Sequence, residues 1–313
     1  MLDHLSPRLQ RFSANDPAHV FYKEFLESCQ RGDVAQVQQC LAQQTQRGRE
    51  WVDSGRERND FQKQRRTWWL ACGLDEATRN DQISVMEYLH SKGAPIRYHT
   101  VEAAKSRESW EFLLNHGLDV NNPMPEANVP LMHIVRLNNP DILRWFLSLG
   151  ADPNYGRNES RLYFEEGAIQ PFSRPEHNSG AALELAAWKC DMEILDILLE
   201  HGAKLENSFA LHRAMMRNPD EQIHLAERLL SYGADVNTIG YLAPPILQGG
   251  TPLSVAARAC AVDQVRWLLE HGADPYACGP QGIKPIDYAA MGGITPRVQQ
   301  VAQLLNQWKK PQV

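Results

Sequence analysis

The feature that most constrains the fold is a short unit, marked by a glycine, that recurs along the chain. The clearest copy is residues 249–278. Thr251 can cap a short helix that accepts Pro252 in its first turn, because that position needs no N–H and suits the fixed φ of proline. A second helix is expected from Asp263 to His271, followed by Gly272 where a left-handed backbone is favoured. Because such short helices are marginal alone in water, the unit must bury its faces against copies of itself.

Copies of this unit follow one another along most of the chain. The glycine that ends the second helix recurs as Gly93, Gly117, Gly150, Gly202, Gly233 and Gly272. The intervals between these glycines are 24, 33, 52, 31 and 39 residues. The short interval indicates a trimmed unit, and the two long intervals indicate insertions.

The unit resembles the ankyrin repeat in its sequence words. These words are Thr-Pro-Leu at 251–253, Ala-Ala at 256–257 and Trp-Leu-Leu-Glu-His-Gly-Ala-Asp-Pro at 267–275. The family period of about 33 residues matches the glycine spacing. The resemblance covers residues 21–308 and is strongest from 129 to 290. It implies an all-α fold, an α-solenoid of stacked helix-turn-helix units with short β-hairpin-like connections.

The resemblance also suggests how the chain is divided. We expect an N-terminal arm over 1–20, a single solenoid of about eight repeat units over 21–308 and a C-terminal tail over 309–313. Segments that do not fit the repeat are interpreted as insertions at about 44–66, 155–179 and 238–248. The first is rich in charge and glutamine and predicts either a solvated loop or a helical insertion. In this family insertions emerge near the hairpin tips, so the aromatic second insertion is expected beside or over the concave groove.

Composition argues against several classes of protein. The 313-residue chain carries a formal net charge of −6, which disfavours a general nucleic-acid binder. The basic run at 47–66 is mixed with acids and has too few aromatic residues for a nucleic-acid patch. No run of 18 apolar residues occurs, and the first nine residues lack the apolar core of a signal peptide. We therefore expect an intracellular protein, cytoplasmic or nuclear, that does not enter a membrane.

The sequence contains no catalytic motif. It has no glycine-rich phosphate loop, no Gly-x-Ser-x-Gly and no His-Glu-x-x-His. The six cysteines lack the spacing of a zinc site, so we expect no metal and no cofactor. His116, His201 and His271 each precede a marker glycine, where the family carries histidine for structural reasons. His212 matches the histidine of the family word Thr-Pro-Leu-His, which implies a hydrogen bond within the repeat array.

The resemblance further implies which side chains face the groove. In the family word Thr-Pro-Leu-His-x-Ala-Ala-x-x, the residue after the histidine position and the two after the alanine pair tend to face the concave side. This register selects as candidate partner-binding residues His133, Arg136, Leu185, Trp188, Lys189, Arg213, Met216, Arg217, Arg258 and Tyr288. Met291 falls in the same register.

Five of these side chains are cationic and none is acidic, in a chain that is net acidic. A row of like charges is destabilising unless it is solvated or matched by an anion, so the row predicts an acidic partner. Trp188, Met216 and Tyr288 supply apolar anchors typical of binding hot spots. The leading hypothesis is a non-enzymatic protein-protein interaction module (a scaffold, adaptor or transcriptional co-regulator) that binds a protein partner with an acidic and apolar segment. The alternative interpretation is that these cations are solvated and that acids of the loops, such as Glu165 and Glu166, balance their charge.

A second hypothesis assigns the groove to a small anionic ligand. The insertions at 155–179 and 238–248 could close over the groove, which would make the chain a small-molecule-binding protein or an unusual enzyme. The aromatic candidates in these insertions are Tyr155, Tyr163, Phe164, Phe172 and Tyr241. Candidate acid and base groups, which no spacing argument links, are His133, Tyr163, Glu165, His177 and Tyr241. Because the family consists overwhelmingly of binding proteins, the sequence favours the first hypothesis over an enzyme.

Overall fold

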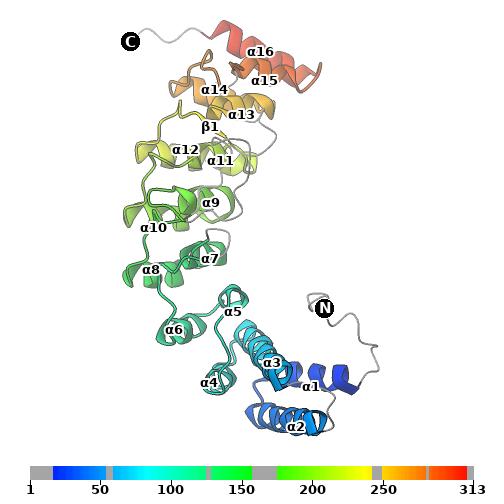
Figure 1. Cartoon of the computed structure of the whole chain (residues 1–313). Coiled ribbons are helices and arrows are strands. Elements are labelled where there is room, and N and C mark those ends of the chain that lie inside the picture. Colours follow the sequence, from blue (N-terminus) through cyan, green and yellow to red (C-terminus); the bar gives the residue numbers. More distant parts are fainter. Residues whose placement is uncertain are drawn as a thin grey trace. The chain divides into compact units, whose positions relative to one another are not determined.

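Pairs of helices make up nearly all of the described structure. The computed structural model describes residues 17–53, 59–124, 128–156, 175–241, 249–279 and 282–308. In these residues, eight inner helices alternate with eight outer helices, and strand is confined to one short hairpin and one isolated bridge (Figure 1). The predicted all-α fold of stacked helix-turn-helix units is confirmed.

The first helix of each pair is called the inner helix and the second the outer helix. The inner helices are α1 (Pro17–Arg31), α3 (Asn59–Arg79), α5 (Tyr98–Ala103), α7 (Pro130–Leu137), α9 (Ala181–Lys189), α11 (Ala210–Ala214), α13 (Pro252–Arg258) and α15 (Pro285–Ala290). The outer helices are α2 (Val34–Asp53), α4 (Ile83–Ser91), α6 (Arg107–Asn115), α8 (Pro140–Ser148), α10 (Met192–Glu200), α12 (Pro219–Ser231), α14 (Val262–Glu270) and α16 (Pro296–Gln307).

The helices group into two compact units, residues 1–119 and 120–313. The first unit contains α1 to α6, and the second contains α7 to α16. The expectation of one continuous solenoid over 21–308, with an arm over 1–20 and a tail over 309–313, stays a prediction.

Proline and capping side chains set the helix starts of the second unit. Proline is the first residue of α7, α8, α12, α13, α15 and α16. Thr251 caps α13 as predicted, because its Oγ1 accepts a hydrogen bond from the N–H of Ser254 at 3.4 Å. Asn139 caps α8 in the same way, with its Oδ1 3.0 Å from the nitrogen of Asp141. These local signals fix where each short helix begins.

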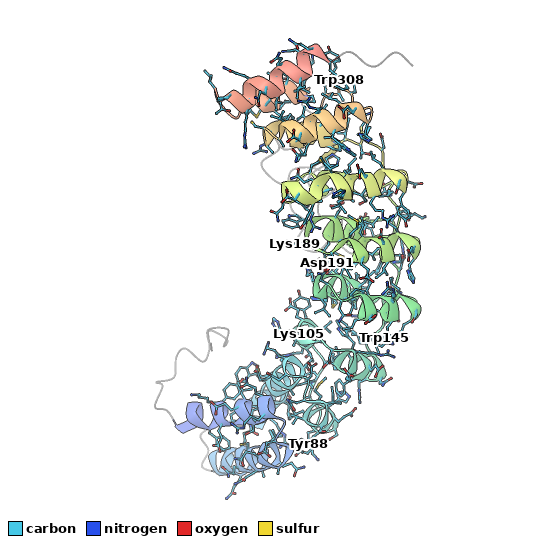
Figure 2. All side chains as sticks on the ribbon, turned by 180° about the vertical axis from the view of Figure 1, so that it is seen from behind. Tyr88, Lys105, Trp145, Lys189, Asp191 and Trp308 are labelled. Atoms are coloured by element: carbon cyan, nitrogen blue, oxygen red, sulfur yellow. The ribbon has the colours of Figure 1, made fainter. Side chains whose placement is uncertain are left out.

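The core of the second unit lies between helices of neighbouring pairs. The inner helices α7 and α9, α9 and α11, and α13 and α15 contact one another, as do the outer helices α8 and α10, and α14 and α16 (Figures 1 and 2). The alanine pairs Ala186-Ala187 and Ala256-Ala257 are buried in these contacts. Because alanine is small, it lets neighbouring helices approach closely, so the stack is dense where the family word places its two alanines.

An asparagine side chain joins one pair of the second unit to the next. The Nδ2 of Asn154 donates to the carbonyl of Gly202 at 2.9 Å, and its Oδ1 accepts from the N–H of Lys204 at 2.8 Å. Asp152 positions this asparagine, because the Asp152 Oδ1 accepts a hydrogen bond from the backbone N–H of Asn154 at 2.8 Å. One amide therefore satisfies both a donor and an acceptor of the following loop. We call this the asparagine clamp.

The clamp recurs wherever the loop carries asparagine at this position. Asn121 makes the same two bonds to the loop at 150–152, and Asn237 makes them to the loop at 272–274. After α10 the position is Glu206. There an ion pair between Asp196 of α10 and Arg228 of α12, at 2.8 Å, joins neighbouring outer helices instead. The asparagine clamp and this surface ion pair thus both link neighbouring helix pairs.

Aromatic packing organises the first unit. Tyr22 of α1 stacks on Trp68 of α3 with ring centroids 5.1 Å apart, and Phe25 lies 5.3 Å from Trp69. Aromatic rings bury large areas and favour such offset or tilted geometries. The cluster holds α1 against α3, at the place where the Thr-Pro-Leu word is missing from the sequence.

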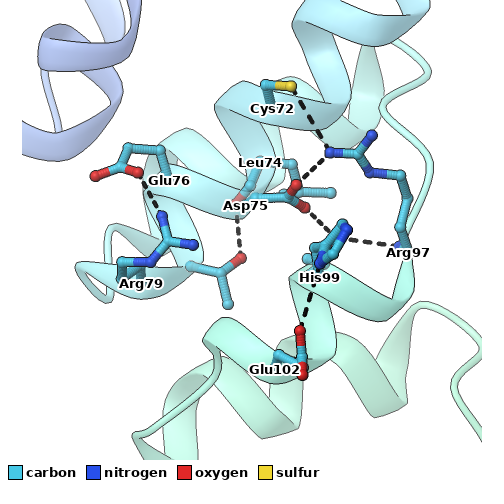
Figure 3. Close-up of polar contacts among 10 residues, drawn as sticks. Cys72, Leu74, Asp75, Glu76, Arg79, Arg97, His99 and Glu102 are labelled. Atoms are coloured by element: carbon cyan, nitrogen blue, oxygen red, sulfur yellow. Dashed lines mark hydrogen bonds and ion pairs between the residues drawn. The ribbon is translucent and has the colours of Figure 1, made fainter. Parts of the chain in front are cut away.

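A buried carboxylate ties α3 to α5 in the first unit. Asp75 accepts a hydrogen bond from the Thr100 hydroxyl at 2.6 Å and pairs with the Arg97 guanidinium (Figure 3). Arg97 also lies 3.7 Å from the Cys72 sulfur. Since a buried carboxylate is costly unless it is paired and hydrogen-bonded, this network fixes how the two helices meet.

The insertion at 44–66 is helical where the structure describes it. Helix α2 continues into this segment as far as Asp53, and α3 begins within it at Asn59. The solvated-loop interpretation is therefore wrong for these two stretches. The segment is rich in glutamine, arginine and glutamate, which favour helix. The side chain of Arg66 on α3 donates to the Thr45 hydroxyl on α2 at 2.6 Å, which links the two extended helices.

The other two insertions are closed at their bases by short antiparallel pairings. Gly156 and Glu176 form an isolated bridge with N···O distances of 3.1 and 2.9 Å. The strands β1 (Gly240–Tyr241) and β2 (Gly249–Gly250) pair antiparallel. Residues 157–174 and 242–248 lie outside the described residues.

Removing one asparagine clamp should lower stability. We expect Asn154→Ala to reduce the free energy of unfolding by about 1 kcal/mol, because two hydrogen bonds to the next loop are lost. Asn218→Ala, which removes an exposed asparagine whose side chain makes no capping bond, should change it by less than about 0.5 kcal/mol. Urea unfolding of the full chain followed by circular dichroism measures both. Equal losses for the two variants would show that the clamp carries no stability.

Candidate binding surface

Five equivalent positions of the second unit are exposed and follow one another across its inner helices. Each is the residue that follows one of the equivalent pairs Ile134-Val135, Ala186-Ala187, Ala214-Met215, Ala256-Ala257 and Ala289-Ala290 at the end of the inner helices. We call this set the inner-helix row: Arg136, Trp188, Met216, Arg258 and Met291. Trp188 is 40% exposed, Met216 46% and Met291 54%. Large apolar side chains at these exposures, between exposed arginines, form a surface suited to contact another molecule.

The position after the histidine does not form a second exposed row. His133 and Leu185 are half-buried, whereas Arg213 and Tyr288 are 9% and 3% exposed. The sequence-based register is therefore wrong in placing Arg213 and Tyr288 on an open groove. At this position the side chain points between neighbouring inner helices, and two of the four are enclosed there.

Arg213 is enclosed because Glu184 from the preceding inner helix accompanies it. The Arg213 Nε lies 3.8 Å from the Glu184 Oε2, and both side chains are nearly inaccessible. Glu184 Oε1 also accepts from the backbone N–H of Phe209 at 3.2 Å. The guanidinium lies 5.0 Å from the centre of the Trp188 ring. Arg213 thus links α9 to α11 and also packs against Trp188, a member of the inner-helix row.

Two further cations are held by groups of their own unit. Arg217 pairs with Glu221 and donates to the carbonyl of Cys190 at 2.5 Å. The Lys189 ammonium lies 4.1 Å from the centre of the Trp188 ring, within cation–π range. Two of the five cations of the register are therefore matched by carboxylates from outside it, because Glu184 accompanies Arg213 and Glu221 accompanies Arg217.

Arg136 and Arg258 behave differently from the paired arginines. Both side chains are exposed, and within the described residues neither has a carboxylate within 4.0 Å. An acidic group of another molecule can reach these two guanidinium groups without breaking an existing ion pair.

Tyr288 and His212 hold the β1–β2 hairpin against the inner helices. The Tyr288 hydroxyl donates to the carbonyl of Gly249, and the His212 Nε2 lies 2.9 Å from the carbonyl oxygen of Gly250. Burial lowers the pKa of His212 from 6.5 to about 4, the Gly250 bond opposes this shift and the Arg213 charge adds to it. At neutral pH His212 is uncharged and donates its Nε2–H. Its predicted role within the array is confirmed.

The histidines before the marker glycines have the expected structural role. The Nδ1 atoms of His116, His201 and His271 lie 2.7 to 2.8 Å from the carbonyl oxygen four residues earlier in their own helices. Each ring closes the last turn of an outer helix, where backbone acceptors lack partners.

The candidates of the small-ligand hypothesis are only partly described. Tyr155 lies against His177 with ring centroids 4.8 Å apart, and the His177 Nδ1 is 3.2 Å from the Asp152 Oδ2. Tyr241 belongs to β1. The remaining candidates, Tyr163, Phe164, Glu165 and Phe172, lie outside the described residues. A pocket under these insertions stays a prediction.

Metal binding and membrane insertion can be judged for the described part of the chain. There, no group of three or more His, Cys, Asp or Glu side chains could hold a metal ion. No helix in the same residues is both long and apolar enough to span a membrane. Sequence reasoning missed Glu184 and Glu221. Glu221 lies on the first turn of α12, four residues after Arg217, which precedes that helix.

Charge reversal should destabilise the protein at Arg213 far more than at Arg258. Arg213→Glu places a second carboxylate beside Glu184 in a buried site, so we expect a loss of at least about 3 kcal/mol in the free energy of unfolding. Arg258→Glu changes an exposed side chain and should cost less than about 0.5 kcal/mol. Urea unfolding of the two variants tests this. A stable Arg213→Glu variant would contradict the buried pair.

His212 should make stability depend on pH. The unfolded chain takes up a proton near pH 6.5 but the folded chain only near pH 4, so stability is full above pH 6.5 and is lost as pH falls between these values. We expect a loss of about 2 kcal/mol between pH 7.5 and pH 5. His212→Gln, which keeps an N–H donor but does not titrate, should show less dependence. Unfolding curves at the two pH values provide the measurement, and identical pH dependence of the two proteins would refute the assignment.

Comparisons with known proteins match the geometry of the second unit. A family model described as "Ankyrin repeats (3 copies)" matches residues 183–278, and one described as "Ankyrin repeat" matches residues 128–158. These ranges contain α7 to α14 in whole or in large part, together with two of the three asparagine clamps.

Several relatives share part of the chain. Ankyrin repeat protein nuc-2 of Neurospora crassa is 32% identical over 137 residues, which are 42% of this chain and 12% of the relative. Regulatory protein NPR5 of Arabidopsis thaliana is 38% identical over 99 residues, 31% of this chain and 18% of the relative. The match thus spans less than a fifth of either curated relative.

A solved structure of the ankyrin repeat domain of Bcl-3, a member of the IkappaB protein family, is also similar. It covers 75% of this chain and 84% of its own at 21% identity and a TM-score of 0.45. The matched family models, the repeated helix pairs and the clamps at the family's loop word agree: the chain contains ankyrin repeats over residues 128–158 and 183–278.

Proposed function

We propose that the chain is a non-enzymatic protein-protein interaction module that binds an acidic and apolar segment of a protein partner along the inner-helix row. The observation that carries the proposal is the exposure of all five row positions, although the residue directly before the row position is buried in four of the five: Val135, Ala187, Met215 and Ala257. Exposed arginine and tryptophan together are the side chains most enriched at protein interfaces.

Charge supports an acidic partner. The exposed guanidinium groups of Arg136 and Arg258 have no ion pair within the described residues, whereas Arg213 and Arg217 already have one. Each exposed pair with a partner carboxylate contributes only about 0–1 kcal/mol, so these contacts set orientation and association rate more than affinity.

Apolar contact supplies the affinity. Trp188 and Met216 are adjacent members of the row and are both exposed. Covering such a side chain contributes about 1.5–3 kcal/mol. The Trp188 ring is already positioned by Lys189 and by Arg213, so little side-chain entropy is lost when a partner covers it. The affinity should therefore depend most on Trp188.

A scaffold, an adaptor or a transcriptional co-regulator all fit this mode of binding. The relative NPR5 is named a regulatory protein, which favours a regulatory role for the present chain as well. Such a role places the protein in the cytoplasm or the nucleus, and it needs neither a cofactor nor a metal.

The proposal predicts that row variants lose a partner that surface variants keep. Partners captured by the full chain are identified by mass spectrometry, purified and titrated by calorimetry. We expect Trp188→Ala with Met216→Ala to weaken binding at least tenfold, and Arg136→Glu with Arg258→Glu to weaken it by a similar factor. The matched control is Arg266→Glu with Arg297→Glu, which makes the same change of charge at exposed positions of outer helices α14 and α16. Binding that survives both row variants would refute the proposal.

A further inference from the structure

We propose that the bound segment is a polyproline II stretch whose recognised side chains recur every three residues, in the order acidic, apolar, apolar, acidic, apolar along the row. This inference rests on the proposed function, because it takes the inner-helix row as the place of binding. It adds the conformation, the spacing and the order of the side chains that the partner presents.

The spacing follows from how the inner helices pack. The helices α7, α9, α11, α13 and α15 contact one another in sequence, and one exposed row residue lies at or just after the C-terminal end of each. Axes of helices packed side by side are about 8–10 Å apart. A chain that lies along the row therefore meets a new row residue about every 8–10 Å.

Only one regular conformation keeps its side chains in step with this spacing. A polyproline II chain has three residues per turn and rises about 3.1 Å per residue, so every third side chain returns to the same face after about 9.3 Å. A β-strand returns to one face after two residues, or about 6.8 Å, which falls between row positions. The side chains on one face of a strand therefore do not recur at the distance between neighbouring inner helices.

An α-helix fits the first step but not the whole row. Seven residues of helix span about 10.5 Å, close to the distance between inner helices. The face of a straight helix drifts by about 20° for every seven residues, which amounts to about 80° at the fifth row position. Such a helix also needs about 29 residues to pass five positions that a polyproline II chain passes in about 13.

The backbone of a polyproline II chain also suits this surface. It has no internal hydrogen bonds and keeps its backbone groups in water, so it needs no strand edge to pair with. In the described part of the second unit the named strands are two residues long, which offers little edge for strand addition. Recognition of such chains commonly uses an exposed aromatic ring, as Trp188 provides.

The order of side chains follows from the identity of the row residues. Arg136 and Arg258 call for acids at the first and fourth recognised positions. Trp188 and Met216 call for two consecutive apolar side chains between them, and Met291 calls for a third after the second acid. Because this order is not symmetric, a segment that is shifted by one row position brings an apolar group against an arginine and an acid against a tryptophan or methionine.

Synthetic peptides test the spacing. A fluorescent 13-residue peptide carries glutamate at positions one and ten, leucine at four, seven and thirteen, and proline, serine or glutamine elsewhere. A second peptide has the same groups in the reverse order, because the chain can run either way along the row. Two comparison peptides change the spacing. The first has the same composition, but its recognised side chains are two residues apart. The second is a 29-residue helix-forming peptide whose recognised side chains are seven residues apart. Fluorescence anisotropy with the full chain gives each Kd.

We expect the better of the two period-three peptides to bind at least tenfold more tightly than the period-two and period-seven peptides. Arg258→Glu should weaken its binding severalfold, and lysine in place of the matching glutamate of the peptide should restore it. Arg297→Glu, at an exposed outer-helix position, should leave the Kd unchanged. Equal or tighter binding of the period-seven or period-two peptide would overturn the inference, as would failure of the charge swap.

The failure of this inference is distinguishable from the failure of the proposed function. If a purified natural partner depends on Trp188 and Met216 but none of the period-three peptides binds, the spacing is wrong and the proposed function stands. If the natural partner is also insensitive to the row variants, both are wrong.

Discussion

The second unit depends on the contact between one helix pair and the next. Its inner helices are five to nine residues long, a length at which an isolated helix is unstable in water. They persist because alanine pairs are buried between neighbours and because an asparagine amide binds both backbone groups of the following loop. The same contacts set the distance between inner helices, and so they also set the spacing of the inner-helix row. Stability and recognition therefore rest on one set of interactions.

Burial decides what each cation of the inner helices does. Arg213 and Arg258 are the same kind of side chain on neighbouring inner helices, but they occupy different register positions. The position of Arg213 points between helices, where a charge is tolerated only with a partner, and Glu184 provides one. The position of Arg258 points outward, where water solvates the guanidinium and another molecule can reach it. A shift of a few residues along a helix separates a structural ion pair from a binding group.

The first unit reaches stability by different means. Its first three helices are 15, 20 and 21 residues long, and they are joined by an aromatic cluster of α1 and α3. Asp75, Arg97 and Thr100 link α3 to the short α5 through a polar network. Longer helices need less support from neighbours, so this part of the chain can depart from the family words and still bury a core.

The sequence by itself determined the helix pairs, most of their ends and the ankyrin repeats. The marker glycines, the proline starts and the alanine pairs are local signals, and Thr251, Pro252 and Gly272 act where the sequence places them. It also identified the exposed row, since Arg136, Trp188, Met216 and Arg258 share one register position. Local signals suffice here because backbone conformation at a helix end depends on the few residues around it.

The tertiary structure alone decided which cations are free. Glu184 lies 29 residues before Arg213 in the sequence, so no spacing rule joins them, and only the packing of α9 against α11 brings them to 3.8 Å. Tyr288 is withdrawn from the surface for the same reason, because its hydroxyl reaches the carbonyl of Gly249 on β2. Whether a side chain is buried depends on what the neighbouring repeat places against it, and a single repeat word carries no information about its neighbour.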